Sequence, residues 1–234
     1  TRFEAGKLTG KKLPVPDGNI ADFAVIVTKS DTGDGASLAL VELNQEAVIR
    51  SSVRTLDFSR GHASIEFKGA EAEILGAEGS GWSAMESLMD RAAVMFAWEQ
   101  VGIADAALEQ ARDYAMGRYA FGRAIASYQA IKHKLADMYV KNTLARSNCY
   151  YGAWALNSDS AELALAAATA RVGAIQASVN AAQENVQTHG GMGFTWEFDC
   201  QFFYRRAKLL SVNIGSEGFW QDKLITAYEQ SNVA

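Results

Sequence analysis

The sequence predicts an α+β protein, in which a small β-domain (residues 1–78) is followed by an antiparallel bundle of long helices (residues 79–234). Three observations support this division. The apolar runs before Gly76 are short and are separated by turn-forming residues. The apolar residues after Gly81 recur at helical intervals. Both prolines of the chain lie in the first part, which is compatible with strands and turns but not with long helices.

The predicted β-domain contains three strand-like runs. Residues 23–27 and 38–41 are continuous apolar runs, and residues 64–67 alternate between polar and apolar side chains. Turn-forming residues stand between these runs, at 14–18 and at 31–35. This pattern is typical of short strands and predicts a small sheet or part of a barrel.

Five helices are predicted in the second part, at about residues 81–116, 127–157, 160–189, 199–210 and 216–231. Ser83 and Glu86 have the spacing of a capping box at the start of the first helix. Ser127 is expected to cap the second helix. Asp159 with Glu162 is expected to cap the third, after a short polar break.

The composition is that of an ordinary globular protein. With 49% apolar residues, 21% charged residues and a net charge of -5, the chain has no basic footprint for nucleic acid. The three histidines are scattered and no serine or cysteine has a base beside it, so we expect neither a metal cluster nor a hydrolase site. Cys149 and Cys200 are expected to be buried thiols. No apolar run reaches the length of a membrane helix, and no signal-like segment opens the chain, so we expect a cytoplasmic protein.

Two segments could carry chemistry. The glycine-rich stretch at 187–194 follows the third helix, where glycine lets a phosphate approach the backbone, although a plain helix C-cap is the more frequent role. The turn at 118–123 holds Arg118, whose guanidinium could grip a pyrophosphate, and Phe121, which could stack on a ring. The alternative for this turn is a solvated loop with Phe121 tucked beneath it.

The two segments stand in the order and spacing of a known family. Residues 118–138 and 185–197 resemble the two signature regions of the acyl-CoA dehydrogenases, and residues 204–208 resemble the helix that follows them. Residues 54–57 and 65–67 match the middle β-domain of this family more loosely. The resemblance implies a flavoenzyme that uses FAD to place a double bond next to the thioester carbonyl of an acyl-CoA.

The resemblance also implies which residues contact the cofactor. In this family they contact the adenosine-diphosphate end of an FAD that is bound mainly by the neighbouring subunit. The corresponding residues here are Arg118, Phe121, Gln129, Gln187, Gly190 and Gly191. Since each flavin would lie across an interface, the resemblance implies an oligomer.

The usual catalytic base of the family is missing. Its glutamate before a glycine corresponds to Ile214, which cannot accept a proton. Some members carry the base on the first long helix, where this chain has Asp90, but this side chain is one methylene shorter and is expected to be an exposed helix residue. Glu217 is a further candidate, although with Ser216 it is expected to cap the last helix. The aromatic-x-Thr-Asn run that lines the flavin ring in the family is also missing, at residues 13–18.

These departures favour a partner role. They predict the base-less subunit of a hetero-oligomer, a tetramer with a homologous acyl-CoA dehydrogenase subunit, of the type found in actinobacterial steroid side-chain degradation. Such an assembly acts on an acyl-CoA substrate. The alternatives are a self-sufficient homo-oligomer that uses Asp90 as base, and a structural or interaction homologue that binds no flavin. The N-terminal helical domain of the family is not represented in these 234 residues, which also begin without an initiator Met.

Overall fold

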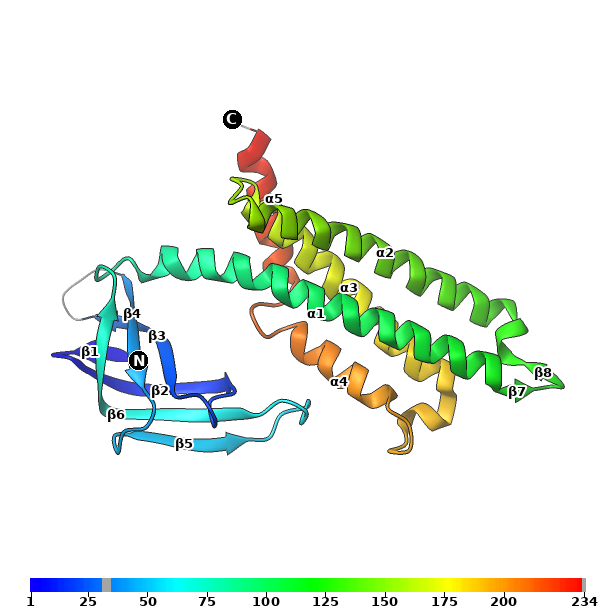
Figure 1. Cartoon of the computed structure of the whole chain (residues 1–234), viewed down its shortest axis with the longest axis horizontal. Helices are drawn as coiled ribbons and strands as arrows, with labels where there is room; N and C mark the ends of the chain where they lie inside the picture. The colour runs from blue at the N-terminus through cyan, green and yellow to red at the C-terminus, as the bar shows by residue number, and fades with distance from the viewer. Residues whose placement is uncertain (31–34, 233–234) are drawn as a thin grey trace. The chain divides into compact units, whose positions relative to one another are not determined.

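The structure, a computed structural model, describes residues 1–30 and 35–232. The chain divides into two compact units, unit 1 (Thr1–Leu88) and unit 2 (Met89–Ala234). Unit 1 carries the first six strands, and unit 2 carries nearly all of the helical residues together with two short strands (Figure 1). A small β-domain followed by an antiparallel helical bundle is the predicted fold class. The turn predicted at 31–35 falls, except for Gly35, outside the described residues.

Unit 1 is built from the strands β1 (Arg2–Glu4), β2 (Lys7–Pro16), β3 (Phe23–Ser30), β4 (Ala36–Glu42), β5 (Val48–Val53) and β6 (His62–Leu75). The strand order is β2-β1-β3-β4-β6-β5, and β2 also pairs with β6, so the ladder closes into a small barrel. β1 and β3 are parallel, whereas β3 pairs antiparallel with β4 and sets Ile26 opposite Ala39. Both of these side chains are buried in the barrel core with Leu8 and Phe67.

Strands β1, β2 and β5 are missing from the sequence prediction, and the turn predicted at 14–18 is misplaced. β2 continues to Pro16, and the turn begins only at Asp17, whose φ is 56°. The register between β2 and β6 shifts between Lys12 and Val15. Because proline has no N–H to donate, it is tolerated in a strand at such an irregularity.

Unit 2 is a bundle of the helices α1 (Gly81–Gly117), α2 (Gln129–Asn157), α3 (Leu163–His189), α4 (Cys200–Leu210) and α5 (Glu217–Asn232), of which α1 begins in unit 1. α3 packs against α2, α4 and α5. Its buried positions are mostly alanines, which let neighbouring backbones approach closely. Val101 of α1, with Met138 and Cys149 of α2, completes the core that joins α1, α2 and α3.

The predicted helix limits are close to the observed ones, but the caps of the first two helices are wrong. Ser83 lies inside the first turn of α1, where its hydroxyl donates to the carbonyl of Ser80. Ser127 belongs to a short 3-10 helix, and Tyr128 takes the N-cap position of α2. Cap spacing alone therefore places a helix start only to within a few residues.

Of the two caps predicted for later helices, the one for α3 is wrong and the one for α5 is confirmed. Glu162 is the N-cap residue of α3 but makes no side-chain cap hydrogen bond. Asp159 has a left-handed φ of 46° and pairs with Arg91 of α1 at 2.9 Å. At α5 the expected cap is present, because the Ser216 hydroxyl accepts a bond from the Phe219 N–H at 3.3 Å.

Both cysteines are buried free thiols, as the sequence predicts. Burial raises the pKa of Cys149 to about 12 and that of Cys200 to about 11. A thiol is reactive mainly as the thiolate, so neither residue is poised for nucleophilic chemistry near neutral pH. Within residues 1–30 and 35–232 there is also no group of three or more His, Cys, Asp or Glu that could hold a metal ion.

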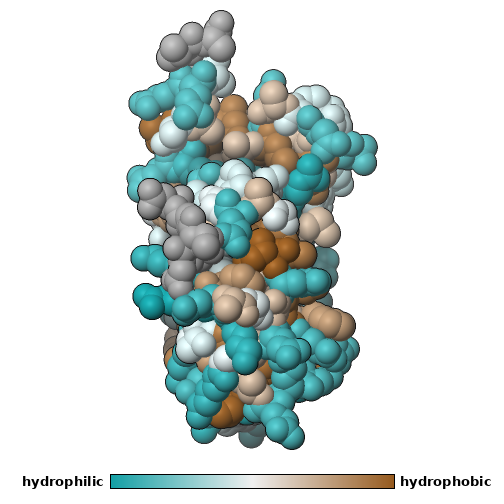
Figure 2. All heavy atoms as spheres, turned by 90° about the vertical axis from the view of Figure 1, so that its left-hand side faces the viewer, coloured by the Kyte–Doolittle hydropathy of each residue, from teal (hydrophilic) through white to brown (hydrophobic). Residues whose placement is uncertain are grey.

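The surface is mixed in polarity. On the face shown in Figure 2, hydrophobic residues lie among a larger number of hydrophilic ones. Large exposed apolar side chains occur in both units, for example Ile20 and Phe23 in unit 1 and Leu144 and Trp154 in unit 2. None of the described helices is long and apolar enough to cross a membrane.

Candidate functional site

The turn that follows α1 is a tight hairpin. Strands β7 (Tyr119–Ala120) and β8 (Arg123–Ala124) pair antiparallel and leave Phe121 and Gly122 as the two loop residues. Both have positive φ, 53° and 80°, as a type I′ turn requires. Glycine adopts this conformation freely, but for phenylalanine it costs free energy, and such strain gathers at functional positions.

Phe121 is not tucked beneath the hairpin. Its side chain is 96% exposed, so the alternative of a buried anchor is wrong. At this exposure the ring gains little from burial within the described part of the chain that could offset the strain of the turn. It is instead available to contact another molecule.

The side chains of Arg118 and Arg123 differ in their contacts. The Arg123 guanidinium lies 4.0 Å from the centre of the Tyr128 ring, and the Tyr128 hydroxyl donates to the carbonyl of Ala120. These contacts hold the hairpin together. Arg118 is exposed, and within the described part of the chain its guanidinium has no hydrogen-bond or ion-pair partner. Its backbone is engaged: the N–H donates to the carbonyl of Tyr114 at 2.8 Å, and the carbonyl accepts from the N–H of Ile125 at 2.8 Å.

The glycine-rich stretch caps α3 and leaves part of its backbone uncovered. Gly190, with φ of 58°, is the C-cap of α3, and its N–H donates to the carbonyl of Gln187. A Cβ at Gly190 or at Gly191 would meet no atom within 4 Å, so this backbone is open to an approaching ligand. At Gly193 a Cβ would lie 2.6 Å from the Val186 carbonyl oxygen, which requires glycine for packing.

The two predicted segments lie together at one end of the bundle. Tyr114, one turn before Arg118, stacks on His189, the residue before Gly190, with ring centres 4.0 Å apart. Gln187 near the end of α3 and Gln129 at the start of α2 are both exposed. Guanidinium, amide and open backbone groups of this kind can hold a phosphate-bearing ligand.

Ile214 lies between α4 and α5 and is half-buried. It packs against an apolar cluster that includes Ile175 of α3 and Trp220 of α5. Its N–H donates a hydrogen bond of 3.0 Å to the Asn213 side chain. The position therefore carries an apolar side chain in apolar surroundings.

Asp90 is not the exposed helix residue that the sequence suggests. It is 8% exposed, and its carboxylate lies 2.5 Å from the ammonium of Lys223 on α5. The interpretation as a solvated surface residue is therefore wrong. The physical reason is that α5 packs back onto α1 and covers this carboxylate.

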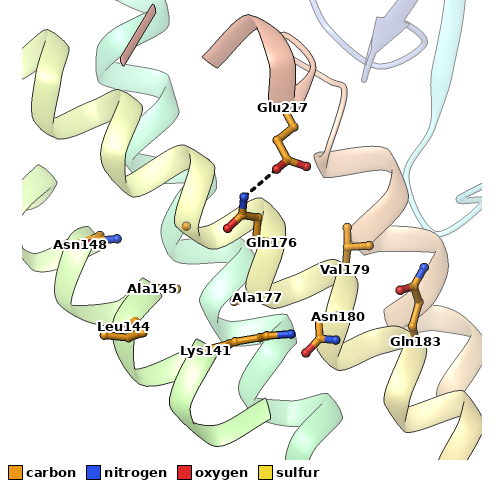
Figure 3. A pocket seen from close by; sticks show the side chains of 11 residues that line it. Lys141, Leu144, Ala145, Asn148, Gln176, Ala177, Val179, Asn180, Gln183 and Glu217 are labelled. Carbon is orange, nitrogen blue, oxygen red and sulfur yellow. Dashed lines mark hydrogen bonds between the residues drawn. The ribbon is translucent and has the colours of Figure 1, made fainter. Parts of the chain in front are cut away.

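Glu217 lies in the first turn of α5, and two side-chain amides bind its carboxylate. Its carboxylate accepts bonds from Gln176 at 2.7 Å and from Gln221 at 3.0 Å. Figure 3 shows the first of these bonds beside an open groove of about 500 Å³, whose lining from α2 and α3 includes the amides of Asn148 and Asn180. Glu217 thus belongs to this groove and not to the turn that holds Ile214.

Three exposed aromatic residues of this end were not singled out from the sequence. Tyr119 is 67% exposed, Phe194 is 81% exposed and Trp196 is 72% exposed. Tyr119 and Phe194 lie within the two predicted segments, and Trp196 lies two residues beyond the second. An aromatic residue beside a glycine turn is the signal that could have identified them, because such a turn seldom has space to bury it.

Comparison with known proteins identifies the family of this chain. The family model described as acyl-CoA dehydrogenase, C-terminal domain, matches residues 79–225. An acyl-CoA dehydrogenase of Bacillus subtilis is 33% identical over 217 residues, which is 89% of this chain and 57% of that protein. Acyl-CoA dehydrogenase IpdE2 of Mycobacterium tuberculosis is 41% identical over 120 residues, covering 51% of this chain and 36% of IpdE2.

Solved structures share the fold over nearly the whole chain. Butyryl-CoA dehydrogenase from Megasphaera elsdenii has a TM-score of 0.90 at 23% identity, over 97% of this chain and 62% of that one. The Tcur3481-Tcur3483 steroid ACAD has a TM-score of 0.87 at 21% identity, over 100% of this chain and 63% of that one. The chain thus spans between about a third and two thirds of the length of these relatives. The chain belongs to the acyl-CoA dehydrogenase family.

Proposed function

We propose that this chain is a subunit of an FAD-dependent, heteromeric acyl-CoA dehydrogenase, in which it completes the FAD site of a homologous partner and has no catalytic base of its own. Residues 1–78 would be the middle β-domain of the family, and residues 79–234 its C-terminal helical domain. One contrast carries the proposal: the groups proposed to face FAD at one end of the bundle are exposed, and the Arg118 guanidinium there has no partner among the described residues, whereas the position of the base holds an apolar residue.

The residues at this end of the bundle fit the pyrophosphate and adenosine end of FAD. Arg118 offers an unpaired guanidinium, and Gly190 and Gly191 offer backbone that no side chain covers. Phe121 offers a fully exposed ring for stacking or for contact with the partner. FAD, when bound, supplies the acceptor for the hydride that leaves the acyl chain. The role of this chain is to bind and orient the cofactor.

Residue 214, in contrast, does not fit the role of a catalytic base. A base that removes the proton next to the thioester must be a carboxylate or a comparable acceptor within hydrogen-bond reach. Ile214 offers neither a lone pair nor a polar environment, because it packs on the cluster around Trp220. The partner subunit would therefore supply both the base and the flavin ring pocket.

The class of substrate is proposed from the relatives. One solved structure with the same fold is a steroid ACAD whose designation joins two components, Tcur3481 and Tcur3483. A heteromeric assembly that acts on a steroid side-chain acyl-CoA is therefore the specific form of the proposal. The exposed apolar side chains of both units are compatible with burial against other subunits.

Flavin content and activity test this proposal. Expressed alone, the chain should be colourless and should not dehydrogenate any acyl-CoA. Co-expressed with a homologue that carries the usual Glu-Gly, it should form a yellow, active complex with fewer flavins than subunits. A yellow homo-oligomer that turns over substrate, or one flavin per chain in the complex, would contradict the proposal.

A self-sufficient enzyme that uses Asp90 is the main alternative, and a substitution separates the two. In the complex we expect Asp90→Asn to leave turnover nearly unchanged, because removal of a true general base typically costs about 10²-fold or more. The melting temperature should fall, since Lys223 loses its buried partner. Asp159→Asn is the control, because it breaks an exposed pair with Arg91 that lies on the same helix α1. A loss of turnover of 10²-fold with normal FAD content would assign the base to Asp90.

A further inference from the structure

Three rings join the segments that flank the proposed FAD-facing residues. Tyr114 of α1 stacks on His189 of α3 with ring centres 4.0 Å apart and an angle of 26° between the planes. Phe198, in the segment before α4, meets both rings edge-on, at 5.8 Å from Tyr114 and 5.4 Å from His189. We refer to Tyr114, His189 and Phe198 as the aromatic trio. It connects parts of the chain that are far apart in sequence.

Each of the two stacked rings belongs to a residue that lies within about one helical turn, along the chain, of a proposed FAD-facing group. The carbonyl of Tyr114 accepts the N–H of Arg118 at 2.8 Å. His189 precedes Gly190, whose N–H donates to the carbonyl of Gln187. A shift of one ring relative to the other would therefore change the distance between Arg118 and the open glycine backbone.

His189 is fixed in this arrangement and is uncharged. It is 3% exposed, and its Nδ1 lies 2.9 Å from the carbonyl oxygen of Asn185. A carbonyl only accepts, so Nδ1 carries the hydrogen. Burial lowers the pKa of His189, which outweighs the opposing effect of this hydrogen bond. The ring is thus a neutral plane that stacks on the phenol of Tyr114.

A second contact ties the same two helices beside the rings. The side-chain amide of Asn185 donates to Gln110 of α1 at 2.7 Å. Asn185 therefore holds His189 through its carbonyl and α1 through its amide. The glycine turn is also packed onto the trio, because a Cβ at Gly193 would lie 3.2 Å from that of His189. The region has little freedom to adjust if a ring is removed.

We propose that the aromatic trio, with His189 at its centre, is a positioning device that holds Arg118 and the Gly190-Gly191 backbone at the spacing needed to contact the same pyrophosphate. This role does not require any of the three rings to touch the cofactor. This inference rests on the proposed function, since it assigns the trio a role in binding FAD. His189, Tyr114 and Phe198 are therefore positioning residues.

The test compares two substitutions of His189 in the complex with the flavin-bearing partner. His189→Ala should weaken FAD binding by about tenfold, close to the value of one aromatic pair, while the circular dichroism stays helical. His189→Phe keeps a stacking ring without the imidazole and should restore most of the affinity. Flavin fluorescence during titration measures the dissociation constant, and a thermal melt measures stability for each variant.

A matched core substitution separates positioning from general stability. Met138→Ala removes a fully buried side chain of α2 from the core shared by α1, α2 and α3. It should lower the melting temperature at least as much as His189→Ala but leave the affinity for FAD unchanged. If His189→Ala does not fold, Phe198→Leu tests the same point with a smaller loss of volume.

The outcomes distinguish this inference from the function on which it rests. If Arg118→Ala leaves FAD affinity unchanged, the shared-site function is wrong and the role of the trio is lost with it. If Arg118→Ala weakens binding but the His189→Ala variant binds FAD normally, only the trio is refuted. The same holds if His189→Phe fails to restore binding, or if Met138→Ala weakens it equally.

Discussion

Arg118→Ala is expected to lower the affinity of the heteromeric complex for FAD by about ten- to a hundredfold, because it removes a charge-assisted contact to a phosphate. The guanidinium has no partner within the described residues, so its removal should leave the fold intact. Activity should fall with flavin occupancy. Since the defect is in binding and not in chemistry, excess FAD should restore turnover. Equilibrium dialysis and steady-state rates at rising FAD concentration measure both effects.

Arg123→Ala is the matched control for this experiment. It removes a second exposed arginine from the same hairpin, but one whose guanidinium lies over the Tyr128 ring. FAD affinity should change little, because the hydrogen bond from Tyr128 to Ala120 and the pairing of β7 with β8 still hold the hairpin. Gln187→Ala should weaken FAD binding in the same direction as Arg118→Ala but less, because a neutral amide makes a weaker bond. If Arg118→Ala and Arg123→Ala change the affinity for FAD equally, Arg118 has no special role in the hairpin. The main support for a shared FAD site would then be removed.

Local patterns were sufficient for the helices and insufficient for half of the strands of unit 1. α1 and α3 are long and periodic, so their existence and approximate limits follow from the sequence. β2 buries only Leu8, and β5 has no fully buried residue, so neither has the apolar run that marks a strand. Their stability comes from pairing with β6, which no local pattern reports.

The same distinction applies to the candidate site, where residues in local motifs could be predicted and contacts between residues far apart in the chain could not. Arg118, Phe121 and the Gly190-Gly191 pair were found because they stand in local motifs. The burial of Asp90 was not, because it depends on Lys223, which lies 133 residues away in the chain. The stacking of Tyr114 on His189 is likewise a contact between two helices. Sequence reasoning could propose groups that face a ligand, because they stand in motifs, but not the contacts between helices that hold these groups in place.

The largest effect on stability is expected for Trp220→Ala. Trp220 of α5 is fully buried and packs in a cluster with Val94 of α1 and Ile175 of α3. Truncation of a buried tryptophan typically lowers the free energy of unfolding by about 3–5 kcal/mol, because it removes apolar burial and leaves a cavity. For a chain of this size the melting temperature should fall by roughly 6–20 °C. Denaturation followed by far-ultraviolet circular dichroism measures this change in the helical unit.

Ile225→Ala on the same helix provides the control for this prediction. Ile225 is 56% exposed, so its truncation should change the free energy of unfolding by about 0.5 kcal/mol or less. Trp220→Phe should be intermediate, since a smaller ring fills part of the cavity. The indole N–H of Trp220 has no hydrogen-bond partner among the described residues, so the loss is one of packing. Because α5 also covers Asp90 through Lys223, a destabilised α5 should expose that carboxylate. An equal effect of Trp220→Ala and Ile225→Ala would mean that α5 does not pack as a core helix of the bundle.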